Sequence, residues 1–237
     1  MISFVVPAYN EEQLLGRTLD AIHAAGRSSG RPYEVIVVDD GSSDRTAAVA
    51  RANAAQVVAV HVRHIARARN AGARAAAGTM LIFVDADTVV SAAAVRGAVA
   101  ALDGGAAGGG VRVLFDGKLP LWARLFIPVL GVVMTAARLA AGCCVFCSRR
   151  AFDAAGGFDE TLYAGEEIFF SRALARSGPV VILPDSVTTS GRKLRSHSGR
   201  DTLWFIAGLL RRGMAQVRSR ERLALWYGER RDDPPGD

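Results

Sequence analysis

The hydrophobic and polar positions of the chain fall into short apolar runs separated by segments of helical periodicity. Runs rich in Ile, Val, Leu and Phe occupy residues 2–6, 33–38, 57–62 and 81–84. Apolar runs with little alternation are typical of strands buried on both faces of a parallel sheet. Between them, apolar residues recur at near-helical spacing, as across residues 14–22. This order predicts an α/β fold, with a mostly parallel central sheet, right-handed crossovers and flanking helices.

The second half of the chain has a less regular pattern. Residues 111–115, 142–148 and 180–184 predict further strands, and the glycine-rich residues 104–110 predict a flexible turn. Residues 119–141 are apolar and contain Trp122 and Phe126. Two interpretations of this segment stay open: an interfacial helix that meets a lipid, or an internal helix that covers the acceptor side of the sheet. Its uninterrupted apolar part is shorter than the ~20 residues that span a bilayer.

Length and charge refine this picture. A chain of 237 residues, half of them apolar, accommodates one large α/β domain or two small ones. Residues 1–191 are nearly neutral, whereas residues 192–231 hold 11 basic and 3 acidic residues. This basic segment fits an anionic surface or a diphosphate ligand, and equally a solvated helical face. We expect a cytoplasmic protein, peripheral at the inner face of the membrane if the basic segment binds lipid, because the N-terminus lacks a basic signal-peptide region.

Several functional classes are disfavoured by missing motifs. The first strand is not followed by G-x-G-x-x-G, and the chain has no G-x-x-x-x-G-K-[ST] loop, which argues against the usual dinucleotide and P-loop sites. The three cysteines lie within five positions. We interpret them as small buried thiols rather than as disulfide or zinc ligands. No nucleic-acid partner is expected.

Polar residues follow three of the predicted strands, in the sequences PAYNEE, DDGSSD and DAD. The carboxyl ends of parallel strands meet at one edge, where such sheets bind ligands. Asp85 and Asp87 would lie on the same side of the strand if its extended conformation continued. Two carboxylates without Cys or His neighbours suit Mg²⁺ or Mn²⁺, which commonly carry phosphates. Alternatively, the pair caps the helix that begins near Ser91.

Four motifs together carry a resemblance to a known family. VPAYNEE, VVDDGSSDRT, RNAGARAAAG and FVDAD, in this order, resemble family 2 glycosyltransferases over about residues 2–180. The resemblance implies a GT-A fold, with a Rossmann-like sheet flanked by helices. Beyond it, the apolar and basic pattern of residues 201–214 predicts C-terminal amphipathic helices. The resemblance also implies inverting transfer of a sugar from a nucleotide-sugar donor, usually UDP- or GDP-linked, to a hydroxyl acceptor. The acceptor stays open between a lipid-linked molecule, a glycan, a small metabolite and a protein.

Site residues follow from the same resemblance. Asp87 would hold the metal on the diphosphate, and Asp85 would face the ribose or sugar and join the metal site. Arg69 and Asn70 lie where the family often meets the donor, although a role in helix packing stays open. Asp40, with Asp39 beside it, would recognise the base. The base and ribose pocket would be lined by Pro7, Ala8, Tyr9 and Glu11.

The acceptor side is implied by GGFDE (156–160) and by the acidic pair Glu166-Glu167. The family usually has Glu-Asp here, with the second acid as general base, which a hydroxyl acceptor requires. We therefore predict Glu167 as the base, with Glu166 as second candidate; alternatively, both acids only complement the helix dipole. Arg192 and Lys193 would stabilise the leaving diphosphate. His197 is a candidate third metal ligand, or simply a solvated residue.

These inferences divide the chain into three parts. The predicted catalytic domain spans 1–191, with a nucleotide-sugar half (1–103) and an acceptor half (104–191). A basic amphipathic helical extension would follow at 192–228, and a disordered tail at 229–237. Two rival functions remain: a catalytically inactive sugar-nucleotide-binding or scaffold protein, and a sugar nucleotidyltransferase. The latter should carry a triphosphate loop after the first strand, which PAYNEE does not resemble.

Overall fold

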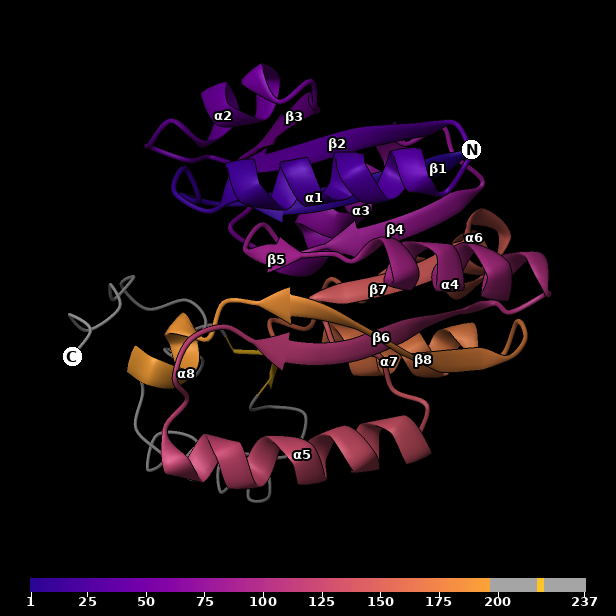
Figure 1. Ribbon diagram of the computed structural model, residues 1–237. Helices are drawn as coiled ribbons and strands as arrows, with labels where there is room; N and C mark the ends of the chain where they lie inside the picture. Colours follow the sequence, from indigo (N-terminus) through magenta and orange to yellow (C-terminus); the bar gives the residue numbers. More distant parts are fainter. Residues whose placement is uncertain (197–216, 220–237) are drawn as a thin grey trace.

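The computed structural model describes residues 1–196 and 217–219, and its centre is a mixed sheet (Figure 1). In the described chain the sheet has eight strands in the order β3-β2-β1-β4-β7-β6-β8-β5. The strands are β1 (Ile2–Ala8), β2 (Tyr33–Asp40), β3 (Gln56–Val60), β4 (Met80–Val84), β5 (Thr88–Val89), β6 (Gly108–Phe115), β7 (Cys144–Ser148) and β8 (Val180–Thr189).

Helices cover both faces of this sheet. One face packs against α1, α2 and α4, and the other against α3, α6 and α7. The helices are α1 (Leu15–Ser28), α2 (Thr46–Ala52), α3 (Ile65–Ala75), α4 (Ala92–Asp103), α5 (Leu121–Ala136), α6 (Arg149–Ala155), α7 (Glu166–Leu174) and α8 (Arg192–Ser196). The predicted α/β architecture is therefore confirmed.

The direction of the strands determines where a site can form. β1 pairs in parallel with β2 and β4, β2 with β3, and β6 with β8. β7 runs antiparallel between β4 and β6, so β6 and β8 point the same way as β1 and β4. Every residue of β1 and β4 is buried, as the uninterrupted apolar runs predict. The carboxyl ends of β1, β2, β4, β6 and β8 consequently lie along one edge.

The prediction of a flexible turn at residues 104–110 is wrong for its last three glycines. Gly108–Gly110 open β6 and are buried between β7 and β8. A Cβ atom at Gly109 would overlap the carbonyl oxygen of Val181, and one at Gly110 would crowd Ala140. These glycines allow close backbone approach inside the sheet. A glycine run therefore gave a turn signal for what is a tightly packed strand.

Helix α5 differs from the interpretation that it lies inside the protein. It stands away from the sheet in Figure 1, and Ala123 is its one buried residue. The internal-helix alternative is therefore wrong. No helix within residues 1–196 and 217–219 is both long and apolar enough to cross a bilayer.

One sheet joins the two predicted halves of the catalytic domain, because β6, β7 and β8 continue the sheet that β1–β4 begin. Of the predicted helical extension at 192–228, the structure describes α8 and residues 217–219. The rest of that extension and the tail at 229–237 lie outside the described residues, so these two predictions stay predictions.

Candidate active site

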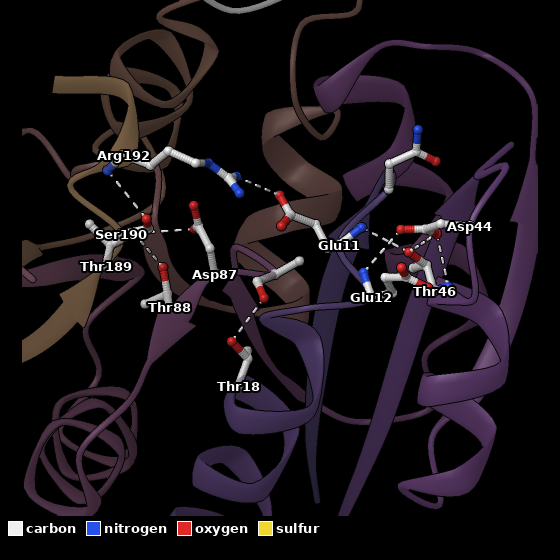
Figure 2. Close-up of polar contacts among 12 residues, drawn as sticks. Glu11, Glu12, Thr18, Asp44, Thr46, Asp87, Thr88, Thr189, Ser190 and Arg192 are labelled. Atoms are coloured by element: carbon white, nitrogen blue, oxygen red, sulfur yellow. Dashed lines mark hydrogen bonds and ion pairs between the residues drawn. The ribbon is translucent and has the colours of Figure 1, made fainter. Parts of the chain in front are cut away.

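Polar residues from three strand ends meet at the carboxyl edge of the sheet (Figure 2). Arg192, two residues after Ser190, places Nη2 3.4 Å from Oε1 of Glu11, which follows β1. At the end of β8, the Thr189 hydroxyl donates to Asp87 Oδ1 over 3.2 Å. In Figure 2 the Arg192 side chain extends past Asp87 toward Glu11. The predicted convergence of polar strand ends is therefore present.

Asp85 and Asp87 lie in a turn rather than on a continued strand. β4 ends at Val84, and the Thr88 N–H donates to the Asp85 carbonyl at 3.0 Å. Because the extended conformation stops there, the two carboxylates have different partners. Asp85 accepts from Arg69 Nη2 at 2.8 Å, whereas Asp87 accepts from Thr189. The expectation that both share a side through strand alternation does not apply.

The side chains that could ligate a metal at this edge suit a cation that arrives together with a phosphate. Among the described residues, no group of three or more His, Cys, Asp or Glu side chains is placed to hold a metal. Mg²⁺ typically binds through one or two carboxylates together with substrate phosphates and water. Two neighbouring carboxylates beside a hydroxyl fit that mode, and they do not form a preformed cage. Asp87, beside the Thr189 hydroxyl, and Asp85, paired with Arg69, are the candidate ligands.

Arg69 connects the predicted donor and acceptor sides of the site. Its side chain is 2% exposed, and Nη1 donates to Glu166 Oε1 at 2.6 Å. Nη2 donates to Asp85 and, at 2.7 Å, to the Gly142 carbonyl. Burial alone lowers the pKa of Arg69, but the Asp85 and Glu166 carboxylates outweigh it and raise the pKa above its ordinary value. Arg69 thus lies beneath the site as a permanent cation between two acids.

Glu166 and Glu167 open α7 directly after Gly165, whose φ of 73° is a left-handed conformation that glycine adopts easily. Glu166 is buried against Arg69, and desolvation raises its pKa although Arg69 opposes this. The Glu167 side chain is half-buried and lies against Gly142. In the described part of the chain, no other side chain forms a hydrogen bond or ion pair with its carboxylate. The two acids therefore differ: one is paired, and the other is available.

Desolvation, followed by the charge of Glu166, raises the pKa of Glu167 to about 8. The charge of Arg69 and, after it, the backbone of Glu167 lower this pKa, and both effects are smaller than that of desolvation. A helix N-terminus favours the ionised form of an acid placed there, but at Glu167 the effect of burial is larger. A carboxyl with a raised pKa accepts a proton more readily than an ordinary surface glutamate.

The predicted base-recognising acids have different surroundings. Asp40 is buried and accepts the backbone N–H groups of residues 62–64 at 2.6, 2.8 and 3.0 Å. Asp39 is half-buried and accepts from the Ser42 N–H at 3.2 Å. Asp40 therefore holds the loop after β3, and Asp39 is the more accessible of the two.

A residue that the sequence did not indicate lies beside Tyr9, one of the residues predicted to line the base pocket. The Arg63 guanidinium carbon lies 3.3 Å from the centre of the Tyr9 ring, a cation–π contact. Arg63 has a φ of 47°, which is uncommon for a side-chain-bearing residue. Pro7 and Ala8, also predicted there, are the buried last residues of β1. The one available signal was that Arg63 follows β3 at the same edge of the sheet.

Asn70 has the packing role that the sequence left open. Its Nδ2 donates to the Phe158 carbonyl at 2.9 Å and to Glu160 at 3.0 Å, and its Oδ1 accepts from the Phe158 N–H at 2.9 Å. These contacts fasten the 156–160 segment to α3. Lys193 follows Arg192 in α8, and His197 lies outside the described residues.

Comparison with known proteins identifies the family. The sequence profile of Glycosyl transferase family 2 matches residues 3–154, more than half of the chain. The chain belongs to glycosyl transferase family 2. This confirms the family inferred from the four motifs.

Two curated relatives match segments of this family 2 chain. A segment of 94 residues is 39% identical to the undecaprenyl-phosphate 4-deoxy-4-formamido-L-arabinose transferase of Pectobacterium carotovorum, over 36% of this chain and 28% of that protein. A segment of 107 residues is 35% identical to the validoxylamine A glucosyltransferase of Streptomyces hygroscopicus, over 43% of this chain and 23% of that protein. The match thus covers less than a third of each relative.

Solved structures agree on the fold. A mannosyltransferase from Pyrobaculum calidifontis, in complex with GDP-Man and Mn²⁺, has a TM-score of 0.66 at 23% identity over 95% of this chain and 68% of its own. The glucosyl-3-phosphoglycerate synthase of Mycobacterium tuberculosis, in complex with Mn²⁺, UDP and glucosyl-3-phosphoglycerate, has a TM-score of 0.57 at 28% identity, over 90% and 79%. The predicted GT-A fold is confirmed.

Proposed function

We propose that this family 2 protein is an inverting glycosyltransferase that moves a sugar from a nucleoside-diphosphate sugar to a hydroxyl acceptor. The observation that carries the proposal is that two pairs of acids, Asp85 with Asp87 and Glu166 with Glu167, are held together by the buried cation Arg69. Asp85 and Glu166 both bind Arg69, with Asp87 two residues from the first acid and Glu167 adjacent to the second. A donor-side carboxylate pair and an acceptor-side base are the parts that single displacement needs.

The acceptor step is supported by Glu167. In an inverting displacement the acceptor oxygen attacks as its proton leaves, so a base must be within reach of that hydroxyl. Glu167 is half-buried and unpaired among the described residues, and it has a raised pKa. Its carboxylate takes the proton, while the ion pair with Arg69 holds the Glu166 side chain in place. A phosphate acceptor is already an anion and needs no base, so an available acid favours a hydroxyl acceptor.

The donor is held at the ends of β1, β2 and β4. Tyr9, whose ring carries the Arg63 guanidinium, lies at this wall, and Asp39 offers an accessible acceptor for the imino N–H of uracil or guanine. Pro7, Ala8 and Glu11 complete that wall, and Asp40 supports it from below. The Arg192 guanidinium, with Lys193 beside it in α8, supplies positive charge as the leaving diphosphate gains negative charge.

Asp87, with Asp85 next to it, would hold Mg²⁺ or Mn²⁺ on the diphosphate of the donor. When bound, the cation would neutralise part of the charge on the leaving group. Both solved neighbours described above contain Mn²⁺ together with a nucleotide or nucleotide sugar, which supports this choice of cofactor.

Two of the similar proteins named above bear on the class of acceptor. The Pectobacterium relative is named for undecaprenyl phosphate, and the M. tuberculosis neighbour was solved with a small phosphorylated product. A hydroxyl acceptor, lipid-linked or small, agrees with the chemistry of Glu167, and no nucleic acid is involved.

The test is turnover of a panel of UDP- and GDP-sugars by the purified full-length chain, with and without Mn²⁺. The expected result is metal-dependent release of UDP or GDP, with transfer products of inverted anomeric configuration by NMR. Donor binding without release or transfer would support the inactive binding protein instead. Formation of a nucleotide sugar from a nucleoside triphosphate and a sugar phosphate would support the nucleotidyltransferase.

A further inference from the structure

Helix α5 presents an apolar surface that nothing in the described chain covers. Seven of the large apolar side chains exposed in the described residues lie on this one helix. The most exposed recur at intervals of three or four residues: Leu121 at 68%, Leu125 at 67%, Val129 at 62% and Val132 at 69%. This spacing aligns them along one side of a helix. An exposed apolar stripe of this size marks an interaction site.

The surroundings of α5 are basic. Residues 117–152 contain no Asp or Glu. Arg124 lies exposed within the helix, and Arg138 lies exposed just beyond its end. A cavity of about 360 Å³ between the end of α5, α7 and the start of β8 is lined by Arg138 and Arg172. An apolar stripe bordered by cations is the pattern of a helix that lies on an anionic membrane surface.

We propose that α5 docks this protein on a bilayer that contains anionic lipid. The stripe of Leu121, Leu125, Val129 and Val132 enters the boundary between headgroups and acyl chains, and Arg138 and Arg172 meet lipid phosphates. The helix has 16 residues, so it lies along the surface rather than across the bilayer.

A second copy of the chain fits this surface less well. Two-fold pairing through α5 would bring the same arginine-bordered surfaces together. No acidic residue between 117 and 152 is available to pair with Arg124 or Arg138 across such an interface. Like charges facing each other oppose association, whereas the same cations are attracted to a lipid surface of negative charge.

The test is co-sedimentation of the full-length chain with vesicles of phosphatidylcholine alone or mixed with phosphatidylglycerol. We expect binding to the mixed vesicles that weakens with added salt. The double substitution Leu125→Glu with Val132→Glu should lower the partition coefficient by about tenfold or more, because it places charge in the stripe. Arg138→Gln with Arg172→Gln should lower it by about fivefold or more on the mixed vesicles, with little change on phosphatidylcholine.

The matched control is Leu114→Glu, which charges an exposed apolar residue of β6, 45% exposed, and should leave vesicle binding unchanged. Thermal unfolding midpoints and calorimetric UDP or GDP binding establish that each variant is folded. These readouts do not depend on sugar transfer, so failure of membrane docking and failure of the proposed activity are distinguishable.

Three results would overturn the proposal. The first is vesicle binding that persists in the double glutamate variant, which would assign it to another segment, such as the basic residues 192–222. The second is a dimer in ultracentrifugation that this variant dissociates. The third is a fluorophore at Val129→Cys that is shielded from iodide in the vesicle-free monomer, because the chain itself then covers α5. Iodide access that is lost only on addition of the mixed vesicles supports docking.

Discussion

Arg69 and Glu166 form a buried ion pair, 2.6 Å between Nη1 and Oε1, with both side chains at most 5% exposed. The pair joins α3 to the first turn of α7, which are separated by more than ninety residues in sequence. Through Nη2 the same guanidinium reaches Asp85. The donor-side and acceptor-side acids are therefore fixed relative to each other by one cation.

Removal of that cation should destabilise the fold. Arg69→Met leaves Glu166 buried without a partner, and loss of one member of a buried pair costs about 3–5 kcal/mol. Denaturant unfolding measures this free energy. Arg67→Met is the matched control, because its pair with Glu160 at 3.5 Å is largely exposed and contributes about 0–1 kcal/mol. Adding Glu166→Gln to Arg69→Met should restore part of the loss; a strictly additive double variant would argue against direct coupling.

Substitutions of the two acids of α7 should have different effects, one on the rate and the other on stability. Glu167→Gln should lower kcat by about 10²–10⁴, the usual contribution of a general base, with an unchanged unfolding midpoint. Glu166→Gln should lower stability, because Glu166 is the one paired with Arg69. Rate assays and thermal unfolding of both variants, with Asp20→Asn at an exposed position of α1 as control, give the comparison. If the pattern were reversed, Glu166 would be the base.

The pH profile should report Glu167. Because its pKa is raised to about 8, the carboxyl is mostly protonated below that pH and cannot accept the acceptor's proton. The value of kcat/KM for the acceptor should therefore rise with pH through this range and level off above it. The measurement is the profile from pH 5.5 to 9.5, at saturating donor and metal. In Glu167→Gln the rise should disappear, whereas a rise that persists there would assign the titration to another group.

Substitution of Asn70 distinguishes a packing role from a contact with the sugar donor. Asn70→Ala removes three hydrogen bonds to the 156–160 segment and leaves the Phe158 backbone groups without their partners. This should cost about 1–3 kcal/mol of unfolding free energy. The KM for the donor should change by less than about twofold, since no binding interaction is lost. A large rise in KM with unchanged stability would restore the donor-contact interpretation.

The sequence predicted the sheet and its ligand edge well because both depend on local patterns. Uninterrupted apolar runs became β1 and β4, and the acids that follow them met at one edge. The contacts of Arg69, Asn70 and Arg63 depend instead on segments distant in sequence, so no local pattern encodes them. The burial that raises the pKa of Glu167 and the close packing of Gly109 are likewise tertiary effects.

Metal dependence should centre on Asp87. Its carboxylate lies beside the Thr189 hydroxyl, whereas the charge of Asp85 is compensated by Arg69. Asp87→Asn should therefore weaken Mn²⁺-dependent binding of UDP or GDP by about tenfold or more, and Asp85→Asn should weaken it less. Calorimetry with and without Mn²⁺ measures both, and Asp20→Asn should match the unaltered chain. If Asp85→Asn abolished the Mn²⁺ effect and Asp87→Asn retained it, the cation would bind through Asp85, and the Arg69 pair would have to open when the donor binds.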